Sequence, residues 1–278
     1  MKILKEPWLQ EKLIKINETV NLKGFVDIHL HTSPDVKPRI CNDLEAAQQA
    51  SDQGMQAVVI KSHAEPTSAR AKIAEDISSM DVFGGVCLNN SVGGLNPLAV
   101  DAAAKMGGKF VWLPTISFSD MEIDFKEGIY KKALEEILQI ISQNDMVLAT
   151  GHLKPHIIFS ILDDARSHGV KRIVINHPLT SVVGATIDEQ KEMARYAFLE
   201  HCFVACMPLH DYLSPDKVAE AIEGTGYKRC IMATDFGQKH NPYPINGFKL
   251  FINSMMERGV TQKQINTMCS KNPKDLLY

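Results

Sequence analysis

Eight short, almost continuously apolar runs recur along the chain, and each is followed by a polar, alanine-rich stretch of helical character. The runs cover residues 25–31, 56–61, 82–88, 109–113, 146–150, 172–176, 202–207 and 230–234. Their starts lie about 29 residues apart on average, which is the length of a strand–helix–strand unit. Strands that are apolar throughout are typical of parallel sheets covered on both faces. This rhythm therefore predicts an α/β fold with a parallel sheet.

The intervening stretches predict helices over 43–54, 66–80, 97–107, 130–144, 156–169, 188–201, 215–226 and 246–258, with a further helix after residue 261. Several of them end at glycine, which suits a left-handed helix cap. Eight strand–helix units in one series, with no Pro/Gly/Ser-rich linker between them, favour a single (β/α)8 TIM barrel over residues 23–278. An open doubly wound sheet is the alternative. Residues 1–22 are expected to form an N-terminal extension, an extra helix outside the barrel.

Composition narrows the classes of partner. The 278 residues include 30 Lys+Arg against 33 Asp+Glu, a net charge of −3, so no basic excess points to nucleic acid. No apolar run reaches the roughly 18 residues that span a bilayer, and the N-terminus lacks the apolar core of a signal peptide. The six cysteines form no paired knuckles and are interpreted as reduced, buried thiols. We therefore expect a cytoplasmic protein with a small-molecule substrate and no nucleic-acid or membrane partner, and self-association to a homo-oligomer stays open.

Side chains with metal chemistry lie where the predicted strands end, and the C-terminal strand ends form the active-site face of a barrel. The first strand ends in His29-x-His31, whose side chains share a face because they are two residues apart. The fifth strand leads into His152, the sixth into His177 and the eighth into Asp235. A lone histidine after a strand is most often an ordinary loop residue. Here, however, four histidines and one aspartate all follow strands whose C-terminal ends lie on the same face of the barrel. Imidazoles with a carboxylate predict a divalent metal site that suits Zn, and Mn, Fe or Co less selectively.

This set resembles the metal ligands of the amidohydrolase superfamily of metal-dependent (β/α)8 hydrolases, and the resemblance runs from residue 25 to the end. It matches the superfamily's strand-end ligands with His29, His31, His152, His177 and Asp235. The closing NPKDLL, residues 272–277, is similar to the NPA-x-LL helix of those proteins. The chain is most similar to an uncharacterised amidohydrolase-like branch. The resemblance implies that Asp235 moves a proton from a metal-activated water to the leaving group. It implies that His177 is either a ligand or the group that stabilises the developing oxyanion.

The ligand set departs from binuclear superfamily members at strand four. Residues 111–115 hold no bridging Lys or Glu there, and Lys61, which ends strand two, is not equivalent to it. One ion is therefore the simpler interpretation. A second ion held by His63, Glu65 or Asp35 stays open.

Strand two supplies candidate substrate-binding residues. Lys61 and His63 are expected to face the mouth together, and Arg70 begins the following helix. As a set they would anchor an anionic group, a carboxylate or phosphate. The alternative for Lys61 is a salt bridge to Asp27 or Asp235, and for Arg70 a structural role is the stronger expectation.

The resulting hypothesis is a hydrolase that uses a metal-activated water on a small, anionic amide, lactone or ester. A phosphoesterase of the polymerase-and-histidinol-phosphatase type, a metal-independent lactonase and a metal-dependent decarboxylase are alternatives, because the ligands do not decide between C–N, C–O and C–C cleavage. A barrel that binds a ligand or metal without catalysis is the non-enzymatic alternative, since a fold does not imply a reaction.

Overall fold

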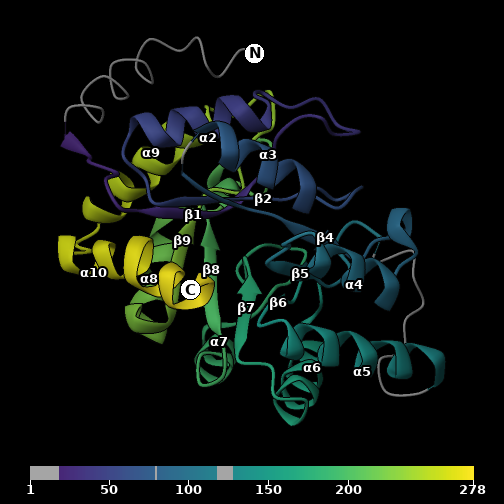
Figure 1. Cartoon of the computed structure of the whole chain (residues 1–278). Coiled ribbons are helices and arrows are strands. Elements are labelled where there is room, and N and C mark those ends of the chain that lie inside the picture. Colours follow the sequence, from purple (N-terminus) through teal and green to yellow (C-terminus); the bar gives the residue numbers. More distant parts are fainter. Residues whose placement is uncertain (1–18, 79, 118–127) are drawn as a thin grey trace.

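The computed structural model describes residues 19–78, 80–117 and 128–278, and its centre is a set of parallel strands surrounded by helices (Figure 1). The strands are β1 (Val26–Leu30), β2 (Ala57–Ile60), β3 (Asp81–Phe83), β4 (Gly85–Cys87), β5 (Phe110–Trp112), β6 (Val147–Ala149), β7 (Arg172–Asn176), β8 (Phe198–Cys202) and β9 (Cys230–Ala233). Every paired neighbour in this series is parallel. The predicted parallel α/β architecture is confirmed.

The strands follow one another in chain order, which is the order of a barrel. The hydrogen-bonded ladders form a β1-β2-β3 sheet and a β4-to-β9 sheet. The predicted third strand is β3 and β4 together, broken at Gly84, so that one half pairs with β2 and the other with β5. At the other seam β1 meets the end of β9 through an isolated bridge, Leu30 with Phe236, and a hydrogen bond from the Asp235 amide to the His29 carbonyl at 2.9 Å. The ladder is therefore interrupted at both seams.

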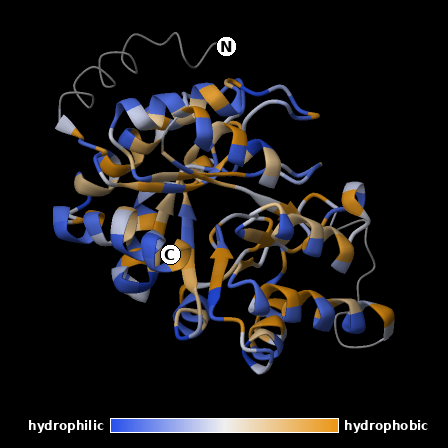
Figure 2. Cartoon of the chain, in the orientation of Figure 1, coloured by the Kyte–Doolittle hydropathy of each residue, from blue (hydrophilic) through white to orange (hydrophobic). Residues whose placement is uncertain are grey.

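Helices form the outer layer of the barrel. They are α2 (Asp43–Asp52), α3 (Ser68–Ser78), α4 (Pro97–Lys105), α5 (Gly128–Gln143), α6 (Pro155–Ser167), α7 (Ile187–Met193), α8 (Pro215–Thr225), α9 (Pro244–Met256), α10 (Gln262–Asn266) and α11 (Asn272–Leu277). Figure 2 shows mostly hydrophobic residues on the strands, except for a hydrophilic part of β8, and a mixture of both kinds on the helices, as expected where one helix face packs inward. The Asn272 amide at the start of α11 donates to the Cys230 carbonyl at 2.7 Å and so ties this last helix to β9.

The predicted seventh strand was wrong, and the helix predicted over 188–201 ends well before residue 201. The helix α7 ends at Met193, and the strand is β8, which includes Glu200 and His201. The apolar run that the sequence offered as a strand, residues 202–207, is largely a short 3-10 helix, Phe203–Cys206. The sequence pattern did not reveal β8 because a strand covered on both faces is expected to be apolar, whereas this one carries two polar side chains.

Three other predictions concern the chain as a whole. The predicted N-terminal extension, residues 1–22, lies for the most part outside the described residues, and Leu22 at its end is buried in the core. All six cysteines are free and buried, as predicted. No helix of the described ranges combines the length and apolar character that crossing a bilayer requires.

Candidate metal centre at the barrel mouth

Five histidines and two aspartates of the described chain line a single cavity at the C-terminal ends of the strands. Ring centroids lie 4.7 Å apart for His31 and His63, 5.0 Å for His152 and His177, and 5.3 Å for His29 and His31. The cavity has a volume of about 280 Å³, and its wall includes His31, His63, His152, His177 and Asp235. The structure therefore brings the predicted strand-end residues together, and it adds His63 to them.

The tightest part of the cluster is the strand-one pair with Asp235. His31 Nε2 lies 3.1 Å and His29 Nε2 3.5 Å from Asp235 Oδ1, and the three donor atoms lie within 4.8 Å of one another. With zinc–ligand bonds of about 2.0–2.1 Å, neighbouring ligands of a tetrahedral ion are about 3.3 Å apart. This donor set therefore fits a divalent ion. His152 and His177 line the same cavity but do not join this close group.

The protonation states of the cluster suit a metal ion. Burial lowers the pKa of His31 to about 3 and that of His177 to about 4, against the opposite effect of Asp235. Burial also lowers the pKa of His63 and of His152 well below the usual value. Burial alone would raise the pKa of Asp235, but the imidazoles of His29, His31 and His177 keep it well below its usual range. Neutral imidazoles and an ionised carboxylate are the forms that a divalent ion binds.

Glu200, in β8, lies directly behind His29. Its Oε2 is 3.2 Å from His29 Nδ1, and the side-chain amide of Asn176 donates to the same oxygen at 2.7 Å. Burial alone would raise the pKa of Glu200, but His29 and Asn176 lower it, so the carboxylate stays ionised. A carboxylate that accepts a hydrogen bond from one imidazole nitrogen fixes the orientation of the ring. It also makes the other nitrogen, here Nε2, a better metal ligand. Sequence analysis missed Glu200 because it placed the seventh strand too far along the chain.

Cys202 completes a second group of close donor atoms with His29 and Glu200. Its Sγ is 3.7 Å from His29 Nδ1, and burial raises the pKa of the thiol well above its usual value. A neutral thiol and a carboxylate already bound to His29 and Asn176 favour a supporting role over a second ion at this place.

The backbone is unusual at two of the predicted site residues. His177 has a φ of 24° and Asp235 a φ of 55°, in the left-handed region that side chains rarely adopt. Such strain is most often found at functional sites, where the surrounding structure enforces it. A Cβ on Gly237 would lie 1.6 Å from the His31 carbonyl oxygen, so only glycine allows the chain after Asp235 to pass so close to β1.

A buried carboxyl group positions the chain just before Asp235. Thr234 Oγ1 donates to Asp27 Oδ2 at 2.6 Å, and the Thr234 amide donates to Asp27 Oδ1 at 3.1 Å. Burial raises the pKa of Asp27 to about 7. These bonds fix the end of β9 against β1, and with it the approach of Asp235 to the strand-one pair.

Lys61 reaches the centre from β2 but pairs with neither predicted carboxylate. It is fully buried, and its Nζ lies 3.2 Å from His29 Nε2 and 5.7 Å from the centre of the Trp112 ring. No carboxylate of the described chain forms a salt bridge with it, so the alternative of a pairing with Asp27 or Asp235 is not met there. An ion bound at His29 Nε2 would displace this ammonium group from the lone pair.

The other two predicted substrate-binding residues differ in position. His63 lines the cavity, and its Nδ1 lies 2.8 Å from Thr115 Oγ1. Arg70 is engaged elsewhere: its Nε donates to Asp43 Oδ2 at 2.8 Å, and its Nη1 pairs with Glu65. These contacts favour a structural role for Arg70, and they leave Glu65 poorly placed to hold a second ion.

His201, next to Glu200, is buried with neither ring nitrogen hydrogen-bonded to a described residue. Burial lowers its pKa to about 4, whereas an unfolded histidine titrates near 6.5, so wild-type stability should fall as the pH falls between these values. We expect His201→Leu to raise the free energy of unfolding by about 1–2 kcal/mol at pH 8. At pH 5 the gain should be about 2 kcal/mol larger.

Urea denaturation at the two pH values, with exposed His156→Leu as the matched control, measures this effect. An equal gain at both pH values would contradict the neutral, unpartnered state of the His201 ring.

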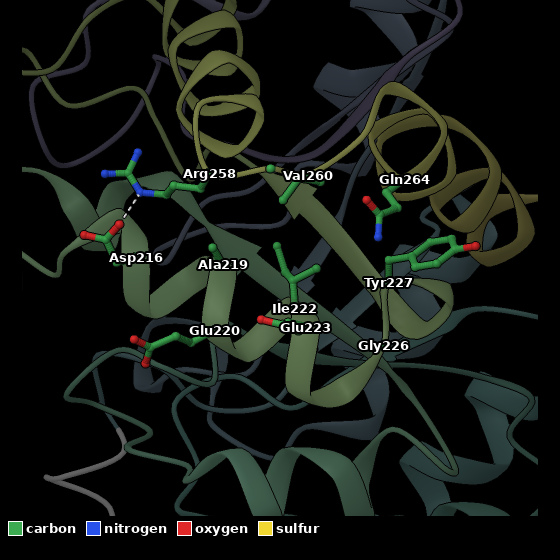
Figure 3. A pocket seen from close by; sticks show the side chains of 11 residues that line it. Asp216, Ala219, Glu220, Ile222, Glu223, Gly226, Tyr227, Arg258, Val260 and Gln264 are labelled. Atoms are coloured by element: carbon green, nitrogen blue, oxygen red, sulfur yellow. Dashed lines mark hydrogen bonds and ion pairs between the residues drawn. The ribbon is translucent and has the colours of Figure 1, made fainter.

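A larger hollow of about 550 Å³ lies on the outer face of the barrel, along α8 and the segment that joins α9 to α10 (Figure 3). An ion pair from Arg258 Nε to Asp216 Oδ1, at 2.7 Å, closes one end of it. Among the described residues of its wall there is no histidine or cysteine. The described wall of this hollow therefore offers no imidazole or thiol as a metal ligand, unlike the cavity at the barrel mouth.

Comparisons with known proteins agree with the barrel. A model of the family described as "Family of unknown function (DUF6282)" matches residues 24–200. The comparison with curated proteins found no match.

Solved structures with the same architecture are distant in sequence. An organophosphorus hydrolase from Deinococcus radiodurans is 12% identical, with a TM-score of 0.63 over 93% of this chain and 93% of that chain. A mutant of a PTE-like lactonase from the same organism is 12% identical, with a TM-score of 0.63 over 95% and 99%. A Pseudomonas putida protein described as a 2-pyrone-4,6-dicarboxylic acid hydrolase is 14% identical, with a TM-score of 0.59 over 93% and 98%. These likenesses confirm the predicted (β/α)8 fold.

Proposed function

This chain belongs to the family of unknown function DUF6282, and we propose that it is a metal-dependent hydrolase that cleaves a small ester, lactone or amide at the barrel mouth. The observation that carries the proposal is the close set of His29, His31 and Asp235. Their donor atoms have the spacing that one divalent ion requires, at the strand ends where barrel enzymes place their chemistry. The names of the distant barrel structures, a lactonase among them, support the same reaction class.

We assign the site one ion, with zinc as the first candidate and manganese, iron and cobalt as alternatives. When bound, the ion supplies a water of lowered pKa at neutral pH and withdraws electrons from a substrate carbonyl. His29, His31 and Asp235 would hold it, with His152 and His177 completing the shell. Six free, buried thiols support a reducing compartment such as the cytoplasm.

Asp235 is the proposed proton carrier. Its Oδ1 faces the two strand-one imidazoles, and no described residue forms a hydrogen bond with Oδ2. We assign Oδ2 the transfer of a proton from the nucleophilic water to the leaving group, because an ionised carboxylate at neutral pH can accept that proton.

His177 is assigned a ligand role rather than that of an electrophile. The Thr180 hydroxyl donates to the His177 carbonyl at 2.8 Å, so Thr180 Oγ1 accepts from His177 Nδ1 at 2.9 Å. The neutral ring then carries its lone pair on Nε2. A lone pair suits an ion, whereas stabilising an oxyanion would need an N–H at that position.

The proposal is tested by metal analysis and a substrate panel. We expect purified protein to contain about one equivalent of divalent metal, and to hydrolyse an aryl ester, a lactone, an amide or a phosphotriester in a chelator-sensitive manner. His31→Ala should lose both metal and turnover, while exposed His156→Ala should keep both. Absence of chelator-sensitive turnover across the panel would favour the non-catalytic binding barrel.

A further inference from the structure

The loop that follows β1 folds around one carboxylate and presents two cations to the cavity. Asp35 Oδ1 accepts from the Lys37 amide at 3.0 Å, and Asp35 Oδ2 accepts from Arg39 Nε at 3.1 Å and Nη2 at 2.9 Å. Lys37 and Arg39 both line the mouth cavity. The two cations are therefore brought to the cavity wall by a shared anchor, and Asp35 is engaged in this loop rather than free for a second ion.

Arg39 is held close to the reacting atoms. It is only 8% exposed, and its Nη2 lies 3.3 Å from Nδ1 of His31. The other nitrogen of that ring, Nε2, faces Asp235. A single imidazole ring therefore separates the guanidinium from the proposed site of hydrolysis. Arg39 Nη1 has no hydrogen bond to any residue that the structure describes, so it is available to donate a hydrogen bond to a ligand.

Lys37 adds a charge that no acid of the cavity wall balances. It is exposed, and it forms no ion pair with a described residue. The second aspartate of the wall, Asp211, accepts hydrogen bonds from the Ser181 hydroxyl and the Ser181 backbone amide. An arriving anion would therefore meet unpaired positive charge on the side of the β1 loop.

We infer that Arg39 and Lys37 form a carboxylate-binding subsite, so that the substrate is an ester, lactone or amide with a carboxylate near the reacting carbonyl. This inference rests on the proposed hydrolase function and specifies its substrate class. A guanidinium fixed by other contacts is a preorganised partner for a carboxylate, and one restrained before binding loses little entropy. The cavity volume of about 280 Å³ limits the substrate to a small molecule. The anion anchor therefore lies on the β1 loop, whereas the sequence suggested Lys61, His63 and Arg70.

The test measures binding without turnover. Calorimetry is carried out with full-length protein, both metal-loaded and treated with chelator, and the probes are succinate and its neutral analogue succinamide. We expect succinate to bind the wild type in both states and succinamide to bind far more weakly. Lys37→Gln should weaken succinate binding about tenfold, and Arg39→Gln about thirtyfold. Arg39→Lys keeps the positive charge but loses the paired N–H donors of the guanidinium. Its loss of succinate affinity should therefore lie between those of the two glutamine variants.

Lys239→Gln is the matched control, because Lys239 is an exposed cation on the loop after β9 and does not itself line the cavity. The inference falls if the wild type binds no succinate, if succinamide binds as well as succinate, or if Lys37→Gln and Arg39→Lys both match the control. Succinate binding that depends on Lys37 and Arg39 without any hydrolysis would uphold the subsite while contradicting the hydrolase proposal. Hydrolysis of neutral substrates without succinate binding would do the reverse.

Discussion

Asp235→Asn should lower kcat about 10³-fold, even with the metal site fully occupied. The amide has nearly the shape of the carboxylate, but it cannot accept a proton from water at neutral pH. Loss of a negative donor beside His29 and His31 should also weaken metal binding. Steady-state kinetics at saturating metal separates the two effects, because added metal restores occupancy but not the proton acceptor.

The control for this variant is Asp163→Asn, which removes an exposed carboxylate from α6 and should leave kcat unchanged. Circular dichroism checks that both variants keep the fold. Unchanged turnover and metal content in Asp235→Asn would show that another group carries the proton.

Glu200→Gln should lower metal affinity by about 10- to 100-fold. The carboxylate accepts from His29 Nδ1 and from the Asn176 amide, and it is buried with a pKa below its usual range. An uncharged amide in its place polarises the imidazole less, so that Nε2 becomes a weaker ligand. Competition with a chromogenic zinc chelator measures the change directly.

Glu223→Gln on the exposed face of α8 is the matched control, and Glu200→Asp should recover part of the affinity. If Glu200→Gln bound zinc as tightly as the control, His29 would have to be oriented by other contacts, or it would not be a ligand.

The strand positions show how much of the fold could be predicted from the pattern of apolar residues. Seven of the eight predicted runs contain strands, because apolar runs followed by amphipathic helices are unambiguous in a parallel sheet. The seventh failed because β8 contains Glu200 and His201, while the apolar residues 203–206 that follow it are helical. A strand that carries a buried polar network is the kind that a pattern of apolar residues misses.

The sequence by itself determined the barrel and the positions of the strand-end histidines and Asp235. These follow from local periodicity and from the rule that parallel strands bring their C-terminal ends to one edge. Side-chain partners across the barrel were not determined in this way. Only the tertiary structure decided that Glu200 lies behind His29, that Lys61 contacts His29, and that Arg70 turns away toward Asp43.

The physical reason is sequence distance. His29 and Glu200 are 171 residues apart, and Arg39 comes from a loop with no periodic pattern, so no local spacing reports where either side chain ends. Burial then sets the charge of each group, because desolvation and the neighbouring side chains act only after the chain has folded. The residue types of the candidate site could therefore be read from the sequence, whereas their orientation, their protonation and the proposed anion-binding loop depend on the folded barrel.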